Sequence, residues 1–299
     1  MALYQAPSFE ALEKLSRSRD ADLARRELLD PDRIRGRGAQ SNVSGRFERQ
    51  RREGFDDGWD NVEPLSIFET VEHVERARTI ITTNDSPDIG FERSINAYRG
   101  CEHGCSYCYA RPSHAFLGHS AGVEFERDIY VKVNAVEALR AEIGAKGYKA
   151  KPIAMGTNTD PYQPAERKHR LTRGILETML ETRHPVMITT KSALIIRDLD
   201  ILTELAGLGL VKVAISMTSM DHKLSRRMEP RASSPAKRLE AIRLLSEAGV
   251  PTAVFASPMI PAINDMELER ILDAAAAQGA RSASMILLRL PGEVRDVFR

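Results

Sequence analysis

The stretch SINAYRGCEHGCSYCYARP, residues 94–112, joins a short β-rich run to a loop that carries every cysteine of the chain. Cys101, Cys105 and Cys108 follow the spacing C-x-x-x-C-x-x-C within eight consecutive residues. Three thiolates from one loop can converge on one centre, and soft thiolates select zinc, copper(I) or iron–sulfur clusters. An odd number of cysteines so close together does not suit a disulfide framework. We therefore expect metal ligation directly after a strand.

Zinc is the main alternative to a cluster at this loop. Structural zinc sites usually have four ligands, and His103, His114 or His119 could supply the fourth. Zinc fingers, however, usually pair two cysteines with a second pair far along the chain, and the sequence has no such pair. The residues alone favour a cluster and leave zinc open.

From Ser94 onward, β-rich runs alternate with amphipathic helical stretches, the pattern of successive βα units. The expected strands lie near residues 94–99, 152–157, 186–191, 211–217, 252–257 and 283–289. An extra strand is expected at 125–133, before a helix from Asn134. Crossovers between parallel strands are right-handed, and repetition of the unit curls the sheet toward a barrel. Six units predict an α/β fold, an incomplete (βα)6 TIM-like barrel of parallel strands with an N-terminal extension.

Short sequence signals mark where three of the helices are expected to begin. Ser234 followed by Pro235 is typical of an N-cap and a first helical position. Asn264 with Glu267 resembles a capping box. Asp198 can cap the helix that follows it.

Residues 1–85 are expected to form a polar extension, partly disordered or wrapping the core, and residues 86–299 the core domain. The extension contains the charge-rich stretches RIRGRG (33–38) and RFERQRREGFDDGWD (46–60). Acidic residues nearly cancel its basic charge, so we favour a solvated arm over a nucleic-acid-binding one. At the other end, EVRDVFR resembles the start of a sixth helix, which leaves open whether the natural chain continues past Arg299.

Composition is that of a globular protein, with 42% hydrophobic and 28% charged residues among 299. The net charge is +1, from 43 basic and 42 acidic residues, and gives no hint of a nucleic-acid or membrane partner. No apolar run approaches the roughly 20 residues that a spanning helix needs. The N-terminus has no secretory signal pattern, so we expect a cytoplasmic location.

Polar residues follow all six expected strands. In chain order these tips are GCEHGCSYCYARP, GTNTDPYQPAE, TTKSA, SMTSMD, ASPMIPAIND and LRLPG. In parallel α/β folds the carboxyl ends of the strands face one mouth, where active sites form. The tips therefore predict a polar pocket around the cysteine loop.

The cysteine spacing after the first strand, with the aromatic Tyr107 before the last cysteine, resembles the radical S-adenosylmethionine superfamily. The runs TNTDPYQPAE, TKS and EPRASSPAKRLEAIRLLSEAGVPTAVFASPMIPAIND resemble its spore photoproduct lyase-like branch, within it the bacterial proteins often labelled DNA repair photolyase-like. The resemblance covers most of the chain from about Asn84.

This resemblance implies a four-iron, four-sulfur cluster whose three cysteine-bound irons leave the fourth iron for the amino and carboxylate groups of S-adenosylmethionine. The reduced cluster would cleave S-adenosylmethionine to methionine and a 5′-deoxyadenosyl radical, which abstracts hydrogen from a substrate. A reduced ferredoxin or flavodoxin-type protein would supply the electron. The substrate is unknown, and nucleic acid is a candidate by analogy with relatives.

The same resemblance implies roles for residues at the strand tips. Thr159 and Asp160 would receive the methionyl ammonium, where many members carry a Gly-Gly-Glu motif. Lys191 would contact the carboxylate, and Ser216 the ribose or carboxylate. The backbone around Tyr107 and the tip from Leu288 to Leu290 would hold adenine. The plainer interpretations are a solvated lysine at 191 and a packed strand-end serine at 216.

Tyr107 and Tyr109 are the catalytic candidates, through a radical path near the cluster. Arg289, Tyr109, Gln163 and Glu166 are candidates for the substrate side.

One departure from the spore photoproduct lyases limits this analogy. Those enzymes carry a hydrogen-donating cysteine two residues before the position of Thr159, and this chain has Thr157 there. No cysteine is left for that role or for a second cluster. The alternative from another class is a non-catalytic iron–sulfur or zinc protein that binds nucleic acid through its arginine-rich arm.

Overall fold

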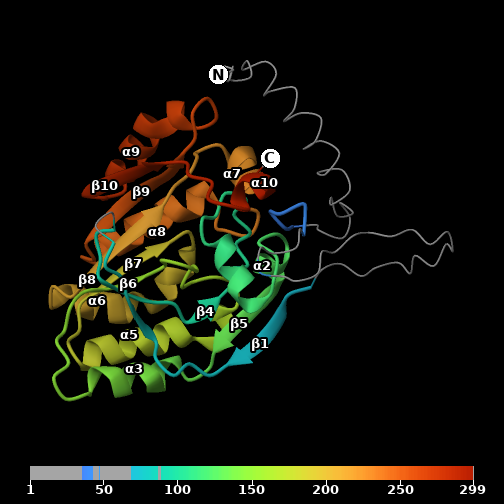
Figure 1. Ribbon diagram of the computed structural model, residues 1–299. Helices are drawn as coiled ribbons and strands as arrows, with labels where there is room; N and C mark the ends of the chain where they lie inside the picture. The colour runs from blue at the N-terminus through green and yellow to red at the C-terminus, as the bar shows by residue number, and fades with distance from the viewer. Residues whose placement is uncertain (1–35, 43–46, 48–68, 87–88, 299) are drawn as a thin grey trace, which may run out of the picture.

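The computed structural model describes residues 36–42, 47, 69–86 and 89–298 (Figure 1). Of the expected extension, the RFERQRREGFDDGWD stretch lies outside the described residues except for Phe47. The division of the chain at residue 85 stays a prediction.

Six parallel strands form one sheet in the order in which they occur along the chain. They are β3 (Arg93–Ile95), β6 (Ile153–Met155), β7 (Val186–Thr190), β8 (Val211–Ser216), β9 (Thr252–Met259) and β10 (Ser282–Leu287). A short strand, β2 (Ile81–Thr83), pairs antiparallel with β3 at the edge. This order confirms the expected α/β fold with consecutive parallel strands.

A second, three-stranded sheet interrupts the expected pattern near the cysteines. It consists of β1 (Val71–Glu75), β5 (Asp128–Lys132) and β4 (Tyr98–Arg99), with β5 in the middle. The strand expected at 94–99 is therefore divided between two sheets. The strand expected at 125–133 begins as a short helix, α2 (Glu124–Arg127), and continues as β5. The cysteine loop starts where β4 leaves the small sheet.

Helices lie between the strands and after the last one. They are η1 (Arg111–Leu117), α3 (Ala135–Ile143), α4 (Glu166–His169), α5 (Leu171–Glu181), η2 (Ala193–Asp198), α6 (Leu199–Gly207), α7 (His222–Met228), α8 (Pro235–Glu247), η3 (Asp265–Glu267), α9 (Leu268–Ala277) and α10 (Val294–Phe298). The helix expected from Asn134 is α3, and the one expected in EVRDVFR is α10. No helix in the described part of the chain is long and apolar enough to span a bilayer.

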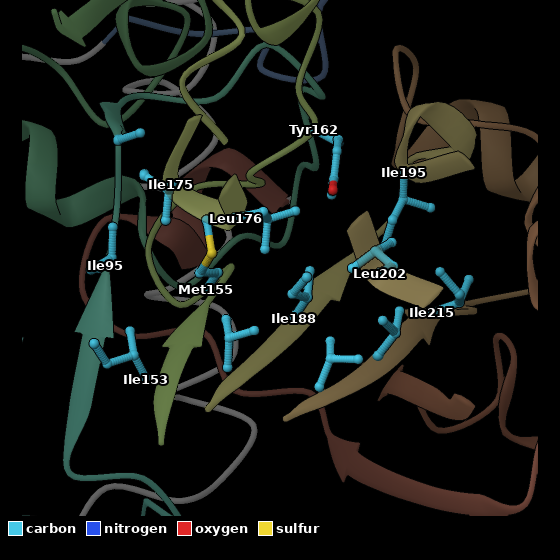
Figure 2. Close-up of a cluster of buried hydrophobic side chains, with 14 of the residues drawn as sticks. Ile95, Ile153, Met155, Tyr162, Ile175, Leu176, Ile188, Ile195, Leu202 and Ile215 are labelled. Atoms are coloured by element: carbon cyan, nitrogen blue, oxygen red, sulfur yellow. The ribbon is translucent and has the colours of Figure 1, made fainter. Parts of the chain in front are cut away.

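The hydrophobic core lies between the parallel strands and the helices that cover them. Figure 2 shows Ile153, Ile188 and Ile215 projecting from neighbouring strands, with Leu176 and Leu202 from helices facing them. All five side chains are buried. Burial of such side chains stabilises a fold by roughly 1.5–3 kcal/mol each, and this holds the strand tips in a fixed arrangement.

Only one of the three expected helix caps is present. Ser234 caps α8, because its Oγ accepts a hydrogen bond from the Lys237 amide. Asp198 makes no cap bond and instead pairs with Arg197, 2.7 Å away. The prediction for Asn264 is also wrong: its side chain donates to Thr218 O at 2.6 Å and accepts from Ile260 N. Tertiary partners outcompete the local cap in both cases.

Candidate active site

The cysteine loop runs from Gly100, after β4, to η1. The Cys101 amide donates to Phe125 O at 2.9 Å, and the Cys108 amide to Cys105 O at 3.2 Å. All three cysteines are free thiols, two of them buried and Cys108 partly exposed. The loop therefore offers three unpaired sulfur ligands at the carboxyl end of the parallel strands.

Apolar side chains surround the thiols. Cys105 packs with Tyr107, Met228 and Ile260, and partly buried Cys108 lies against the same cluster. Burial raises the pKa of Cys105 to about 12. A buried thiol of this kind becomes a thiolate ligand when a bound cation replaces its proton. The donor set is the soft, sulfur-only one that an iron–sulfur cluster requires.

Among the described residues, no group of three or more histidine, cysteine, aspartate or glutamate side chains is arranged as ligands of a single metal ion. His114, one of the proposed fourth ligands, bonds through Nε2 to Asp128 O at 3.1 Å. His119 bonds to the Tyr130 hydroxyl at 2.8 Å. His103 Nδ1 lies 3.3 Å from Asp160 Oδ2 without hydrogen-bond geometry. His114 and His119 therefore bond within the surrounding framework, whereas His103 Nδ1 has no hydrogen-bond partner among the described residues.

Asp160, at the tip of β6, is held by donors from the next strand tip. Its carboxylate accepts from the Thr190 hydroxyl at 2.7 Å and from the Lys191 amide at 2.8 Å. Burial alone would raise the pKa of Asp160, but His103 and these hydrogen bonds hold it well below the usual range. Asp160 thus ties two strand tips to the cysteine loop, and its contact with a methionyl ammonium stays a prediction.

Thr159 lies in the same tip and is buried. Asn96, between β3 and β4, accepts from the amides of Asn158 at 2.9 Å and of Thr159 at 3.2 Å. The exposed Tyr109 donates from its hydroxyl to Thr157 O. Asn96 and Tyr109 therefore both contact the tip of β6 around Thr157.

Tyr107 is buried beside Cys105 and hydrogen-bonded to a carboxylate. Its hydroxyl donates to Glu229 Oε1, which also accepts from the Thr218 hydroxyl at 2.6 Å. Burial and the Glu229 charge raise the pKa of Tyr107 well above its usual value. Arg238 forms a buried ion pair with Glu229 and donates to Ser216 O at 3.0 Å. Tyr107 is thereby fixed as a neutral phenol.

Lys191 follows β7 and brings an amine to the same place. Its Nζ lies 5.7 Å from the centre of the Tyr107 ring, a cation–π contact. Burial would lower the pKa of Lys191, but the negative charges of an ionised Cys105 and of the Glu229 carboxylate raise it above the ordinary value. Within the described residues its Nζ has no hydrogen bond or ion pair. It is a charged donor free to bind an anionic group.

The structure brings Leu288 to this group but leaves Ser216 in a packing role. Leu288 packs against the cluster of Cys105 and Tyr107, and its amide donates to Met259 O at 2.9 Å. Ser216 is 1% exposed, and its hydroxyl lies 3.4 Å from Ser257 O. Contacts of both residues with a cofactor stay predictions.

Two candidates for the substrate side are buried framework residues. Gln163 accepts from the Glu102 amide at 3.0 Å and donates to Gly100 O at 3.2 Å, so it holds the cysteine loop. Glu166 accepts from Tyr98 and from Arg197. Both side chains are 0% exposed, whereas Arg289 is exposed.

Sequence reasoning missed Glu229, Arg238 and Asn96. Glu229 and Arg238 lie nine residues apart around a turn and a helix start, so no periodic pattern links them. The only sequence signal for Glu229 and Arg238 was that charged residues follow a polar strand tip. Asn96 lies within a run that resembled an uninterrupted strand.

A family model described as the radical SAM superfamily matches residues 95–275. This is more than half of the 299 residues, and the chain belongs to this superfamily. The resemblance drawn from the cysteine spacing is confirmed. The class is one of enzymes, and membership implies S-adenosylmethionine and a four-iron, four-sulfur cluster as cofactors.

Curated relatives include an uncharacterised protein of Mycobacterium tuberculosis strain H37Rv, 36% identical over 210 residues, which are 70% of this chain and 62% of that protein. Another is an uncharacterised protein of Methanocaldococcus jannaschii, 32% identical over 178 residues, 60% of this chain and 64% of that one. The chain thus spans less than two thirds of the length of these relatives.

Solved structures of spore photoproduct lyase have a similar fold. One of them, a cysteine-to-serine mutant, matches with a TM-score of 0.58 and 19% identity, over 76% of this chain and 65% of that one. The lyase complexed with dinucleoside spore photoproduct matches with the same TM-score, identity and coverage. At this identity the likeness concerns the fold alone.

Proposed function

We propose that this protein is a radical S-adenosylmethionine enzyme that binds a four-iron, four-sulfur cluster through Cys101, Cys105 and Cys108. The observation that carries the proposal is a loop with three free thiols next to the uncommitted amine of Lys191. A cluster held by these three cysteines would supply, once reduced, the electron for cleavage of S-adenosylmethionine to methionine and a 5′-deoxyadenosyl radical. The residues of the chain bind, orient and shield these groups.

Lys191 would bind the cofactor carboxylate, because its Nζ is a charged donor beside Cys105 and Tyr107. Leu288 would cover the adenine from the tip of β10, since it packs against the same two residues. Thr159, Asp160 and Ser216 would complete the site. Of these, Asp160 offers a carboxylate. Its two oxygens also accept hydrogen bonds from the Thr190 hydroxyl and the Lys191 amide.

Tyr107 is buried and Tyr109 is exposed, so we assign them different roles. Tyr109 is 62% exposed, and its hydroxyl lies at Thr157 O, so it can meet a substrate at the mouth. Tyr107 is held by Glu229 behind the cysteine loop. A hydrogen-donating thiol is absent from the sequence, so repair of spore photoproduct by that route is not part of the proposal.

A polyanion, such as nucleic acid, is the substrate class that the surface near the site supports best. The α7 helix packs on Cys105 through Leu224 and Met228. Its solvent side carries Lys223, Arg226 and Arg227, which are exposed and have no ion pair with any described residue. Clustered cations of this kind bind phosphate backbones.

The remaining parts of the proposal concern the cellular setting. A reduced ferredoxin or flavodoxin-type protein would deliver the electron, and the enzyme would work in the cytoplasm. Residues 86–299 would form the core domain, with residues 1–85 as its extension.

The test is anaerobic reconstitution with iron and sulfide, reduction with dithionite in the presence of S-adenosylmethionine, and measurement of 5′-deoxyadenosine. Cys105→Ala should abolish both the iron–sulfur absorbance and the product, whereas the neighbouring Ser106→Ala should retain both. Uptake of zinc alone, or a cluster without any 5′-deoxyadenosine, would instead favour the non-catalytic alternative. Full iron content in Cys105→Ala would contradict the ligand assignment.

The substrate class is tested separately, with a fluorescent single-stranded DNA of mixed sequence. Lys223→Glu with Arg227→Glu should weaken binding at least tenfold, because two phosphate contacts become repulsive. The matched control is Lys237→Glu on α8, where the lysine is exposed but pairs with Glu240. If the wild type, the double variant and Lys237→Glu bind the DNA equally well, α7 is ruled out as the phosphate-binding surface.

A further inference from the structure

Residues 36–42, which we call the latch, lie across the outer side of the cysteine loop. In Figure 1 the latch is the short blue segment beside α2. Its Arg37 was expected in a solvated arm, but this side chain is buried and donates to Glu126 O at 2.6 Å. The charge-rich RIRGRG stretch therefore ends in a docked segment.

The closest contact of the latch is with the cysteine loop itself. A Cβ atom added at Gly38 would lie 1.6 Å from Gly104 O and 3.4 Å from Ser106 N. Gly104 directly precedes Cys105 and has a φ of +68°, a left-handed conformation that glycine adopts readily. Only a residue without a side chain can pack here, so Gly38 supports the backbone between two of the three thiols.

A buried carboxylate joins the latch to the loop a second time. Glu126 accepts from the amides of Gly38 at 2.9 Å and Ala39 at 2.8 Å. It also accepts from Arg111 at 2.5 Å, and Arg111 donates to Cys105 O at 2.9 Å. Both ionic side chains are 0% exposed. The carbonyl of Cys105 is therefore linked through Arg111 and Glu126 to the latch.

The far end of the latch is anchored on α2. The Val123 amide donates to Ser41 O at 3.1 Å. Asn42 bonds twice to Glu124, as a donor to its carboxylate at 3.1 Å and as an acceptor from its amide at 3.3 Å. The side chain of Ala39 is buried against Val123. The latch is thus fixed at both ends of its contact with the loop.

We propose that the latch holds the cysteine loop in the conformation that binds the iron–sulfur cluster, with Gly38 as the positioning residue. A loop that must present three ligands at once loses less conformational freedom on binding when its backbone is already fixed. Gly38 precedes Gly104 by 66 residues in the sequence (104 − 38), so the latch supplies this fixation from a distant segment. The proposal rests on the cluster of the proposed function.

The test compares Gly38→Ala with Gln40→Ala in the full chain. Gln40 is the matched control because it lies in the latch but is exposed. Each protein is reconstituted anaerobically, and transfer of its iron to an external chelator is followed by absorbance. Gly38→Ala should release iron at least tenfold faster than wild type, and Gln40→Ala at the wild-type rate.

A second variant covers the case in which Gly38→Ala does not fold, as judged by circular dichroism. Asn42→Ala loosens the latch at α2 without entering the cysteine loop, and it should release iron several-fold faster than wild type. Wild-type release rates in the folded glycine or asparagine variant would overturn the latch and leave the proposed function intact. A wild-type protein that binds no cluster would overturn the proposed function, and the latch with it.

Discussion

Two buried arginine–glutamate pairs lie near the cysteine loop, an outer one bonded to the latch and an inner one bonded to Tyr107, and their carboxylates accept from different kinds of partner. The outer pair, Arg111 with Glu126, bonds chiefly to the backbone: Arg111 donates to three carbonyls, and Glu126 accepts from two amides. In the inner pair, Arg238 also donates to two carbonyls, but the Glu229 carboxylate accepts from the hydroxyls of Tyr107 and Thr218 rather than from amides.

This difference separates the fixing of the chain path from the orientation of the pocket. An ion pair that satisfies backbone groups determines where the loop runs, and either partner left alone would be a buried, uncompensated charge. An ion pair that satisfies side chains determines which way those side chains face. Removing parts of each pair should therefore affect stability and cofactor binding in different proportions.

The largest effect is expected from Arg111→Ala. It leaves the Glu126 charge buried and removes one donor from each of three carbonyls, which should lower the free energy of unfolding by about 3–5 kcal/mol. Urea unfolding of the protein before reconstitution measures this loss. Arg243→Ala, which removes an exposed pair with Glu247, should leave the stability nearly unchanged. A small loss in Arg111→Ala would remove the proposed contrast between the two pairs.

Glu229→Gln should have the next largest effect on the free energy of unfolding, about 1.5–3 kcal/mol. The amide keeps the shape of the side chain, and Arg238 retains two backbone carbonyl acceptors. The same urea titration applies, with the exposed Glu240→Gln on α8 as the control. A loss as large as that of Arg111→Ala would mean that the inner pair also determines the chain path.

Lys191→Met tests whether the inner side faces a cofactor. It should weaken S-adenosylmethionine binding to the reconstituted protein about tenfold, equivalent to about 1.4 kcal/mol, because a charge-assisted bond to the carboxylate is lost. Stability should change little. Calorimetric titration under anaerobic conditions measures the affinity, and Lys237→Met serves as the exposed control. Unchanged affinity would show that Lys191 is only a solvated or ring-stacked lysine.

Tyr107→Phe should have the smallest effect, about 1 kcal/mol of unfolding free energy, because Glu229 keeps Thr218 and Arg238 as donors. The iron content after reconstitution should equal that of wild type. Tyr109→Phe is the matched comparison. Because the Tyr109 ring is exposed, this change should lower the free energy of unfolding less than Tyr107→Phe does. Loss of the cluster in Tyr107→Phe would show that the inner network supports the loop as strongly as the outer one.

The regular part of the fold could be predicted from the sequence because its signals are local. Strands such as β7 and β8 are apolar runs bounded by helix signals, and the strand tips follow from parallel topology. The cysteine spacing is likewise contained in a single loop. These are features in which neighbours along the chain determine the structure.

The supports of the loop could not be predicted, because they depend on contacts between distant segments. Gly38 lies in a stretch whose charges suggested a solvated arm, and only its approach to Gly104 explains the glycine. Asp198 and Asn264 have the residue types of helix caps, yet both side chains are used in tertiary contacts. The break at Asn96 divides a β-rich run between two sheets for the same reason.

Ala39 also has a consequence for the order in which the protein is completed. Its buried side chain packs with Val123 and with Val297 of α10, a helix that comes much later in the chain than the cysteine loop. During synthesis on the ribosome, the three thiols and α2 are made long before α10. A nascent chain therefore passes through a stage in which the cysteine loop exists but its outer support is incomplete.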